Sequence, residues 1–255
     1  MFMLTNAHLH FDKNYSSSDF GGTAVCFSAG SAEEWSDAAA FVRGLKNASG
    51  DGLASDAFAL VSAGLHPWNL ETCSTAAAKK KLLWLEELLA DNADEVAAVG
   101  ECGIDLYSLK LKTALPAQIF AFEKQMELAE RYKKPLVVHC RRSIQYFFEY
   151  APRLIKLPSV IFHAFPGTLS ECESLLKRGL NAYFSFGGSF LRGGKKAAEC
   201  VAGLPDDRLL LETDADECAP ALLQKVYDAA ADIRGTTVEK LCAVCENNFR
   251  RAFLC

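Results

Sequence analysis

The chain contains the stretch Leu209-Leu210-Leu211-Glu212-Thr213-Asp214-Ala215-Asp216, in which an apolar run ends abruptly in carboxylates. Three leucines with no polar alternation predict a strand that is buried on both faces, as in a parallel sheet. An unpaired buried carboxylate is very costly, so a metal ion, an arginine partner or protonation has to neutralise the charge at the end of this strand.

The rest of the chain repeats the pattern of a short apolar run followed by a helical segment. The predicted strands are 2–4, 23–27, 58–63, 96–99, 135–138, 160–162, 182–186 and 209–211. The predicted helices are 31–48, 75–92, 116–133, 144–156, 169–178, 195–202, 221–234 and 237–253, and Pro152 predicts a kink or break in the fourth of them. Eight such units in about 250 residues predict an α/β fold, a (β/α)8 TIM-like barrel, with residues 1–255 as a single domain.

Composition excludes several classes of protein. The chain has 255 residues, half of them hydrophobic, and a net charge of −5, which argues against a strongly basic nucleic-acid coat protein. No apolar run reaches the roughly 18 residues of a transmembrane helix, and no secretory signal is visible, so we expect a cytoplasmic protein without a membrane partner. The 10 cysteines are scattered through strand and helix patterns and predict free thiols. No feature indicates an obligate protein partner.

Six potential metal ligands follow predicted strands. They are His8, His10, Glu101, His139, His163 and Asp214. Active sites of TIM-like barrels lie at the carboxyl ends of the strands, where these residues would meet. Taken alone, each histidine of this set is better explained as a structural or surface polar residue than as a metal ligand. All five histidines of the chain follow apolar runs, however, and coincidence explains that poorly.

Four histidines and two carboxylates suit a pair of divalent ions. Glu101 can bridge two ions through its two oxygens, which a histidine cannot do. Two ions close together stabilise the attacking and leaving oxygens of a displacement and lower the pKa of a bound water. Imidazole and carboxylate ligands are compatible with zinc, manganese or iron, and less selectively with magnesium, and the sequence does not choose among them.

Basic residues follow two of the predicted strands. Arg141 and Arg142 come just after His139, and Arg192, Lys195 and Lys196 follow the seventh predicted strand, in a glycine-rich loop that leads into a helix. Backbone amides at a helix start favour phosphate, and positive charge beside a metal site indicates an anionic substrate. A solvated basic loop is the alternative interpretation.

Six motifs, in order along the chain, resemble those of the TatD-type metal-dependent deoxyribonucleases, which are amidohydrolase-like barrels. They are Asn6-Ala-His8-Leu-His10-Phe-Asp12, Gly64-Leu-His66-Pro67, Gly100-Glu101-Cys-Gly103-Ile-Asp105, His139-Cys-Arg141, His163-Ala-Phe165-Pro-Gly167 and Leu211-Glu212-Thr213-Asp214. This resemblance implies a barrel nuclease that uses two divalent ions.

The resemblance also implies roles for individual residues. One ion would bind His8, His10, Glu101 and Asp214, and the second would bind Glu101, His139 and His163. Asp214 would orient or deprotonate the attacking water, with Glu101 between the ions. Arg141 would contact phosphate, His66 would lie near the substrate, and Lys195 or Lys196 would add positive charge.

Four residues depart from the pattern of this family. Asn6 replaces an aspartate, Trp68 a common histidine, Arg142 a common aspartate and Asp216 a proline. The loss of a carboxylate beside His8 predicts weaker binding of the first ion, because such carboxylates raise the basicity of metal-bound histidines. None of the four is an expected ligand.

These observations favour a metal-dependent hydrolase of phosphodiesters, with DNA as the expected substrate, in which two ions of magnesium, manganese or zinc activate a water. An amidohydrolase that cleaves an amide, lactone or acyl ester is a second hypothesis. A third is a catalytically weak metal-binding homologue, which Asn6 alone supports.

Overall fold

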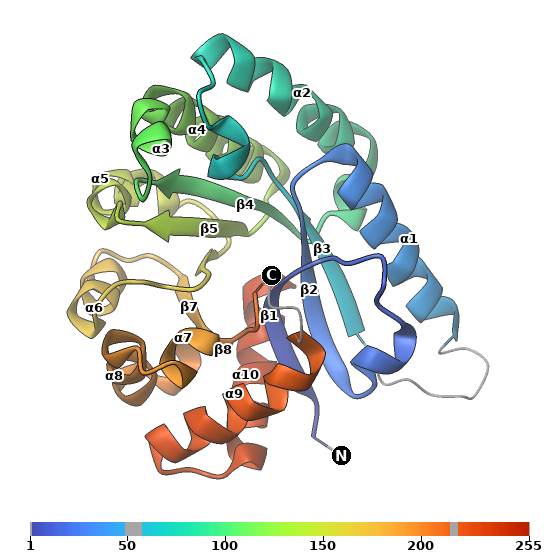
Figure 1. Ribbon diagram of the computed structural model, residues 1–255, viewed down its shortest axis with the longest axis vertical. Coiled ribbons are helices and arrows are strands. Elements are labelled where there is room, and N and C mark those ends of the chain that lie inside the picture. The colour runs from blue at the N-terminus through green and yellow to red at the C-terminus, as the bar shows by residue number, and fades with distance from the viewer. Residues whose placement is uncertain (1, 49–57, 215–218, 255) are drawn as a thin grey trace.

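Eight parallel strands form one sheet in the order of the sequence, with helices around the outside (Figure 1). The structure, a computed structural model, describes residues 2–48, 58–214 and 219–254. The sheet nearly closes on itself, because Leu9 of the first strand forms a bridge with Asp214, which follows the last. The predicted (β/α)8 architecture is therefore confirmed.

The strands and helices alternate along the chain. The strands are β1 (Leu4–His10), β2 (Thr23–Ala29), β3 (Phe58–Ala63), β4 (Ala98–Asp105), β5 (Leu136–Arg141), β6 (Val160–Phe162), β7 (Ala182–Phe186) and β8 (Leu209–Leu211). The helices are α1 (Ala32–Ala48), α2 (Thr75–Asn92), α3 (Leu109–Thr113), α4 (Leu115–Tyr132), α5 (Ile144–Leu154), α6 (Leu169–Lys177), α7 (Gly188–Leu191), α8 (Lys195–Gly203), α9 (Ala219–Arg234) and α10 (Val238–Phe253).

Two strands extend well beyond their apolar runs. β1 continues to His10 and β4 continues to Asp105, so the predicted ends of both strands were wrong. The reason is that pairing with β2 and β5 satisfies the backbone whatever the side chains are. The candidate ligands His8, His10 and Glu101 consequently lie within strands, where the backbone holds them firmly.

The other boundaries differ less. α5 passes through Pro152 and ends two residues later, so this proline does not break the helix where it stands. The short helices α3 and α7 occupy segments that the apolar pattern left as loops. The eight cysteines described form no disulfide, as predicted.

Side chains from seven of the eight strands fill the interior of the barrel. These side chains are Ala7, Ala24, Cys26, Ala98, Val137, Ile161, Tyr183 and Leu210. From β3, the partly buried Phe58 and Leu60 pack against this cluster. Phe249 and Phe253 of α10 belong to the same cluster. Since α10 covers the amino ends of the strands, the carboxyl ends are left to form the site.

Within the described ranges, no helix combines the length and the apolar character needed to cross a membrane.

Candidate metal centre

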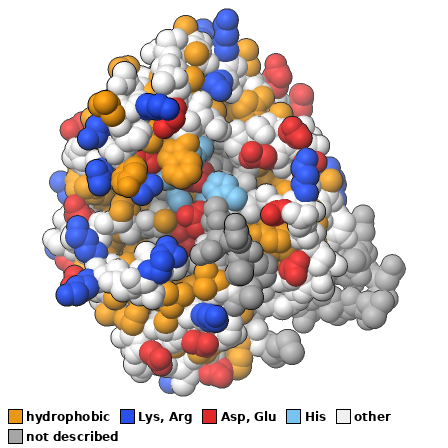
Figure 2. All heavy atoms as spheres, in the orientation of Figure 1, with side chains coloured by type: hydrophobic (Ala, Val, Ile, Leu, Met, Phe, Trp, Pro, Cys, Tyr) orange, Lys and Arg blue, Asp and Glu red, His pale blue; other side chains and the backbone are white. Residues whose placement is uncertain are grey.

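A cavity of about 550 Å³ opens at the carboxyl ends of the strands. Five of the six predicted ligands line it: His10, Glu101, His139, His163 and Asp214. Figure 2 shows histidine side chains at the bottom of a hollow, with hydrophobic and basic side chains on its rim. A second cavity, of about 520 Å³, lies at the amino ends of the strands, but no histidine lines it. Chemistry rather than volume therefore identifies the site.

Glu101 is the centre of the site, and its side chain is only 3% exposed. Its Oε2 lies 3.1 Å from His8 Nε2 and 3.3 Å from His10 Nε2. Asp214 Oδ1 lies 3.7 and 3.8 Å from the same two nitrogens. These three side chains form a first group of donor atoms around one oxygen of Glu101.

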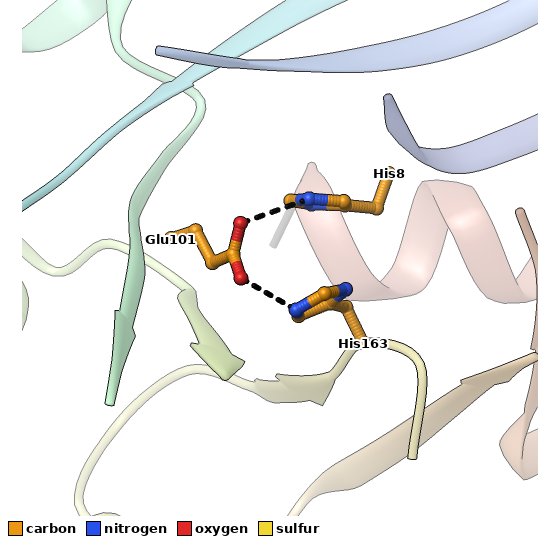
Figure 3. Close-up of side chains that lie close together, drawn as sticks. All are labelled: His8, Glu101 and His163. Carbon is orange, nitrogen blue, oxygen red and sulfur yellow. Dashed lines mark ion pairs between the residues drawn. The ribbon is translucent and has the colours of Figure 1, made fainter. Parts of the chain in front are cut away.

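The other oxygen of Glu101 faces a second group. Glu101 Oε1 lies 2.6 Å from His163 Nε2, 2.7 Å from His139 Nδ1 and 3.0 Å from His66 Nε2. Figure 3 shows His8 and His163 approaching different oxygens of the same carboxylate. The carboxylate thus joins two groups of donors, which is the arrangement expected of a bridging ligand.

Irregular strand geometry directs Glu101 toward this point. The β4–β5 pairing shifts register between Val99 and Cys102, and irregularities of this kind re-aim side chains. Gly100 has a φ of +131°, and a Cβ there would collide with the carbonyl oxygen of Val137. Gly103 has a φ of +152°, and a Cβ there would collide with His139 O. Glycines therefore permit the close approach of β4 and β5.

Two buried carboxylates lie behind the histidines. Asp105 Oδ2 is 3.0 Å from His139 Nε2, the nitrogen that faces away from Glu101. Glu212 Oε1 is 3.6 Å from His163 Nδ1 and accepts a hydrogen bond of 2.7 Å from the Ala164 amide. Neither carboxylate was predicted to contribute to the site, although each lies within one of the six family motifs. Carboxylates of this kind orient metal-binding histidines and raise their basicity.

The charges of the cluster follow from burial and mutual attraction. Burial alone would raise the pKa of Glu101, but the neighbouring histidines, His163 foremost, hold it well below its ordinary value. Burial alone would lower the pKa of His139 and His163, but hydrogen bonds and charge from Asp105 and Glu101 raise the first, and Glu101 raises the second well above normal. For His66 burial prevails, and its pKa is lowered.

The donor atoms fit divalent ions. Among the described residues, His8 Nε2 and Glu101 Oε2 are buried without a hydrogen-bond partner, which is unusual for such groups. The separations of 2.6 to 3.3 Å between Glu101 and the four predicted histidine ligands suit atoms that share ions at bond lengths of about 2.0–2.2 Å. His66 differs, since its Nδ1 accepts from the Trp68 amide at 3.1 Å. In the neutral ring Nε2 then carries the hydrogen, so His66 is a donor to Glu101 rather than a ligand.

The predicted substrate-binding residues are divided. Arg141 lines the cavity beside His66. Lys195 and Lys196 begin α8 and are exposed, and neither is among the described residues that line the cavity. Arg192 instead lines a smaller adjoining cavity of about 200 Å³, together with Asp214.

Asn6 does more than remove a charge. Its Nδ2 donates to Thr213 Oγ1 at 2.7 Å, and its Oδ1 accepts from the Thr213 amide at 3.0 Å. The Asn6 side chain therefore links β1 to Thr213, the residue between Glu212 and Asp214. Asp216, another departure from the family pattern, lies outside the described residues.

The barrel, with histidines and carboxylates gathered at the carboxyl ends of its strands, defines an amidohydrolase-like protein with a candidate metal centre. The TatD-related DNase family matches residues 6–254, and the chain belongs to this family.

Relatives agree with this assignment, and a solved structure agrees with the fold. The chain is 32% identical to the 3'-5' ssDNA/RNA exonuclease TatD of Erwinia billingiae over 209 residues, which is 75% of this chain and 76% of that protein. It is 34% identical to the protein of the same name from Edwardsiella piscicida over 214 residues, 77% of this chain and 78% of that protein. The crystal structure of a TatD homologue from Escherichia coli K12 superposes with a TM-score of 0.77 at 24% identity, covering 99% of this chain and 98% of that one.

Proposed function

We propose that this protein is a divalent-metal-dependent phosphodiesterase that cleaves single-stranded DNA. The observation that carries the proposal is the division of donor atoms between the two oxygens of Glu101: His8, His10 and Asp214 on one side, His139 and His163 on the other. The names of the relatives, which act on single-stranded DNA and RNA, support the choice of bond and substrate.

When bound, two divalent ions would supply the positive charge that activates a water and stabilises the leaving oxygen. His8, His10, Glu101 and Asp214 would hold the first ion, and Glu101, His139 and His163 the second. Zinc, manganese and magnesium all remain compatible with this set of donors.

Three residues of the chain would have further roles in the reaction. Burial alone would raise the pKa of Asp214, but His163 and His8 lower it, so this carboxylate is ionised at neutral pH and can accept a proton from the attacking water. Arg141 lines the cavity and would pair with the phosphate of the substrate. The Nε2–H of His66 holds the Oε1 side of Glu101 in place.

The test is hydrolysis of end-labelled single-stranded DNA by metal-stripped protein refilled with magnesium, manganese or zinc. We expect cleavage only with metal, and a loss of at least roughly 100-fold in Glu101→Gln, since one substitution removes a ligand from both ions. Glu173→Gln, which alters a surface carboxylate that pairs with Lys177, serves as the matched control.

The same experiment includes RNA and a panel of carboxyl esters, lactones and amides. Cleavage of a carboxyl ester or amide, without cleavage of any phosphodiester, would establish the amidohydrolase hypothesis instead. Folded, metal-loaded protein that hydrolyses nothing in the panel would overturn the proposal and favour a metal-binding homologue.

A further inference from the structure

An exposed tryptophan stands at the mouth of the cavity. Trp68 belongs to a short 3₁₀ helix, Pro67–Leu70, and lines the cavity while remaining 56% exposed. Its Nε1 donates a hydrogen bond of 2.8 Å to Asp105 Oδ2, and its ring centroid is 5.2 Å from that of His66. The indole is therefore held by one edge while much of its surface is open to solvent.

A tyrosine ring lies under two arginines, one of which lines the cavity. Tyr107 is 52% exposed, and its ring lies under the guanidinium carbons of Arg141, at 3.9 Å, and of Arg142, at 4.8 Å. Contacts of this kind attract a cation to the ring face. Tyr107 thereby holds Arg142 next to Arg141, which lines the cavity. Arg142 itself is exposed and is not among the described residues that line it.

One carboxylate ties this rim to the metal-binding histidines. Asp105 accepts from Trp68 Nε1, from the Tyr107 amide at 2.7 Å and from His139 Nε2 at 3.0 Å. It is fully buried, and all three partners are donors. Because they share one acceptor, Trp68 and Tyr107 are fixed relative to the centre.

A single exposed aromatic residue needs no functional explanation. Here, however, the exposed ring lines the same cavity as the candidate ligands, and Arg141 lines that cavity too. Trp68 and Arg142 are also two of the positions at which this chain departs from the family pattern. An exposed indole and a guanidinium group complement the two parts of a nucleotide, which are a flat base and an anionic phosphate.

We propose that Trp68 is a stacking platform for one unpaired nucleobase next to the scissile phosphate, and that Arg141 and Arg142, held on Tyr107, bind phosphates of the same strand. This inference rests on the proposed function and names the residues that recognise its substrate. A base within a duplex has both faces stacked, so only an unpaired base can use the indole. Stacking tolerates any base, so we expect little sequence preference.

The experiment measures kcat/KM on single-stranded oligonucleotides in which one nucleotide at a time, counted from the cleaved end, is abasic. In wild type, removal of one particular base is expected to cost roughly tenfold, the size of one base–aromatic stack. Trp68→Ala should lower kcat/KM about tenfold on the intact strand and should cause no further loss of kcat/KM on the abasic strand. Trp68→Phe, which keeps a ring but loses the bond to Asp105, should retain the dependence on the base.

Phe2→Ala is the matched control, because Phe2 is a similarly exposed aromatic residue (59%) that precedes β1 and does not line the cavity. It should behave as wild type. If Trp68→Ala slows intact and abasic strands equally, or if Trp68→Phe is as slow as Trp68→Ala, Trp68 acts through Asp105 alone and the inference is overturned.

Equilibrium binding of the same oligonucleotides, followed by fluorescence anisotropy on metal-loaded protein, separates this inference from the proposed function. Wild type that binds intact strands more tightly than abasic ones, with the difference lost in Trp68→Ala, supports the platform even if no cleavage occurs. Cleavage without any dependence on the base overturns the platform alone. Neither binding nor cleavage overturns both.

The arginines have a separate readout. Replacing Arg142 by glutamine should reduce the slope of log affinity against log salt by about 0.7, the value for one phosphate contact on a single strand. Arg178→Gln is the matched control, since Arg178 also lies 4.8 Å over an aromatic ring, that of Phe148 on α5, whereas Arg142 shares the Tyr107 ring with the cavity-lining Arg141. An unchanged slope in Arg142→Gln would exclude a phosphate contact for this residue.

Discussion

His139 is hydrogen-bonded through both of its ring nitrogens. Nδ1 faces Glu101 at 2.7 Å, and Nε2 faces Asp105 at 3.0 Å. The contact with Asp105 sets the tautomer of the neutral ring, because a hydrogen on Nε2 leaves Nδ1 free to bind an ion. Asp105 is thus a positioning residue for the candidate metal centre.

Asp105→Asn should weaken metal binding by about 10- to 100-fold, the usual effect of losing such a carboxylate. The asparagine amide would donate to His139 Nε2 and force the hydrogen onto Nδ1, which would then point at Glu101. Isothermal titration of metal-free protein with zinc or manganese measures the change. Asp37→Asn, which alters the carboxylate that pairs with Lys13 on the surface, should leave the affinity as in wild type. Equal affinities for wild type and Asp105→Asn would refute this role.

At the scale of elements, the site depends on irregularities in two strands. The β1–β2 register shifts between Asn6 and Leu9, around His8, and the β4–β5 register shifts around Glu101. An irregularity re-aims a side chain that a regular ladder would place elsewhere. The strands thus provide rigid positions for His8 and Glu101.

Gly100→Ala tests the role of the irregularity in β4. The free energy of unfolding should fall by more than about 1 kcal/mol, because alanine is strained at positive φ and its Cβ meets the Val137 carbonyl. Gly44→Ala in α1, where nothing lies within 4 Å of the added Cβ, should instead raise it by about 0.5–1 kcal/mol. Urea unfolding of both variants gives the two values. A stability of Gly100→Ala equal to that of wild type would mean that β4 tolerates a side chain there.

At the scale of the whole molecule, the apolar core and the charged centre occupy different ends of the barrel. The interior cluster between the strands and α10 consists of buried hydrophobic side chains and includes none of the candidate ligands, so it does not depend on metal. We therefore expect metal-free protein to remain folded.

The effect of pH on the metal-free fold follows from the pair formed by His163 and Glu101. The pKa of His163 is raised well above 6.5, because Glu101 outweighs burial; its stabilising contribution is complete below pH 6.5 and is lost as pH rises through the folded value. The pKa of Glu101 lies well below 4.5, so its contribution is complete above pH 4.5 and is lost as pH falls through the folded value. The pair therefore stabilises metal-free protein most between pH 4.5 and 6.5.

Metal binding should stabilise the protein more as pH rises above 6.5, because each histidine must lose its proton to become a ligand. The difference in Tm between metal-loaded and metal-free protein should widen as pH rises through the raised pKa of His163. Thermal unfolding with excess metal and with a chelator, over a series of pH values, measures this difference. A difference that stays constant with pH would show that His163 is not protonated in the metal-free state.

Much of the fold could be predicted from the chain because each strand carries its own local signal. Leu209–Leu211 and Val160–Phe162 are short apolar runs, and both were predicted with the boundaries observed. β1 and β4 were predicted too short, because their carboxyl halves carry polar residues that pattern alone assigns to loops. The cytoplasmic location and the single-domain organisation stay predictions.

The sequence by itself determined the barrel, the family and the six candidate ligands, because apolar periodicity and motif order are local properties. Only the tertiary structure decided which oxygen of Glu101 each histidine faces, that Asp105 and Glu212 lie behind His139 and His163, and that Lys195 and Lys196 are away from the cavity. It also brought Trp68 to the Asp105 carboxylate, which lies 37 residues away in the chain. The physical reason is that these contacts join segments that belong to or follow different strands, and their distances arise only when the sheet closes.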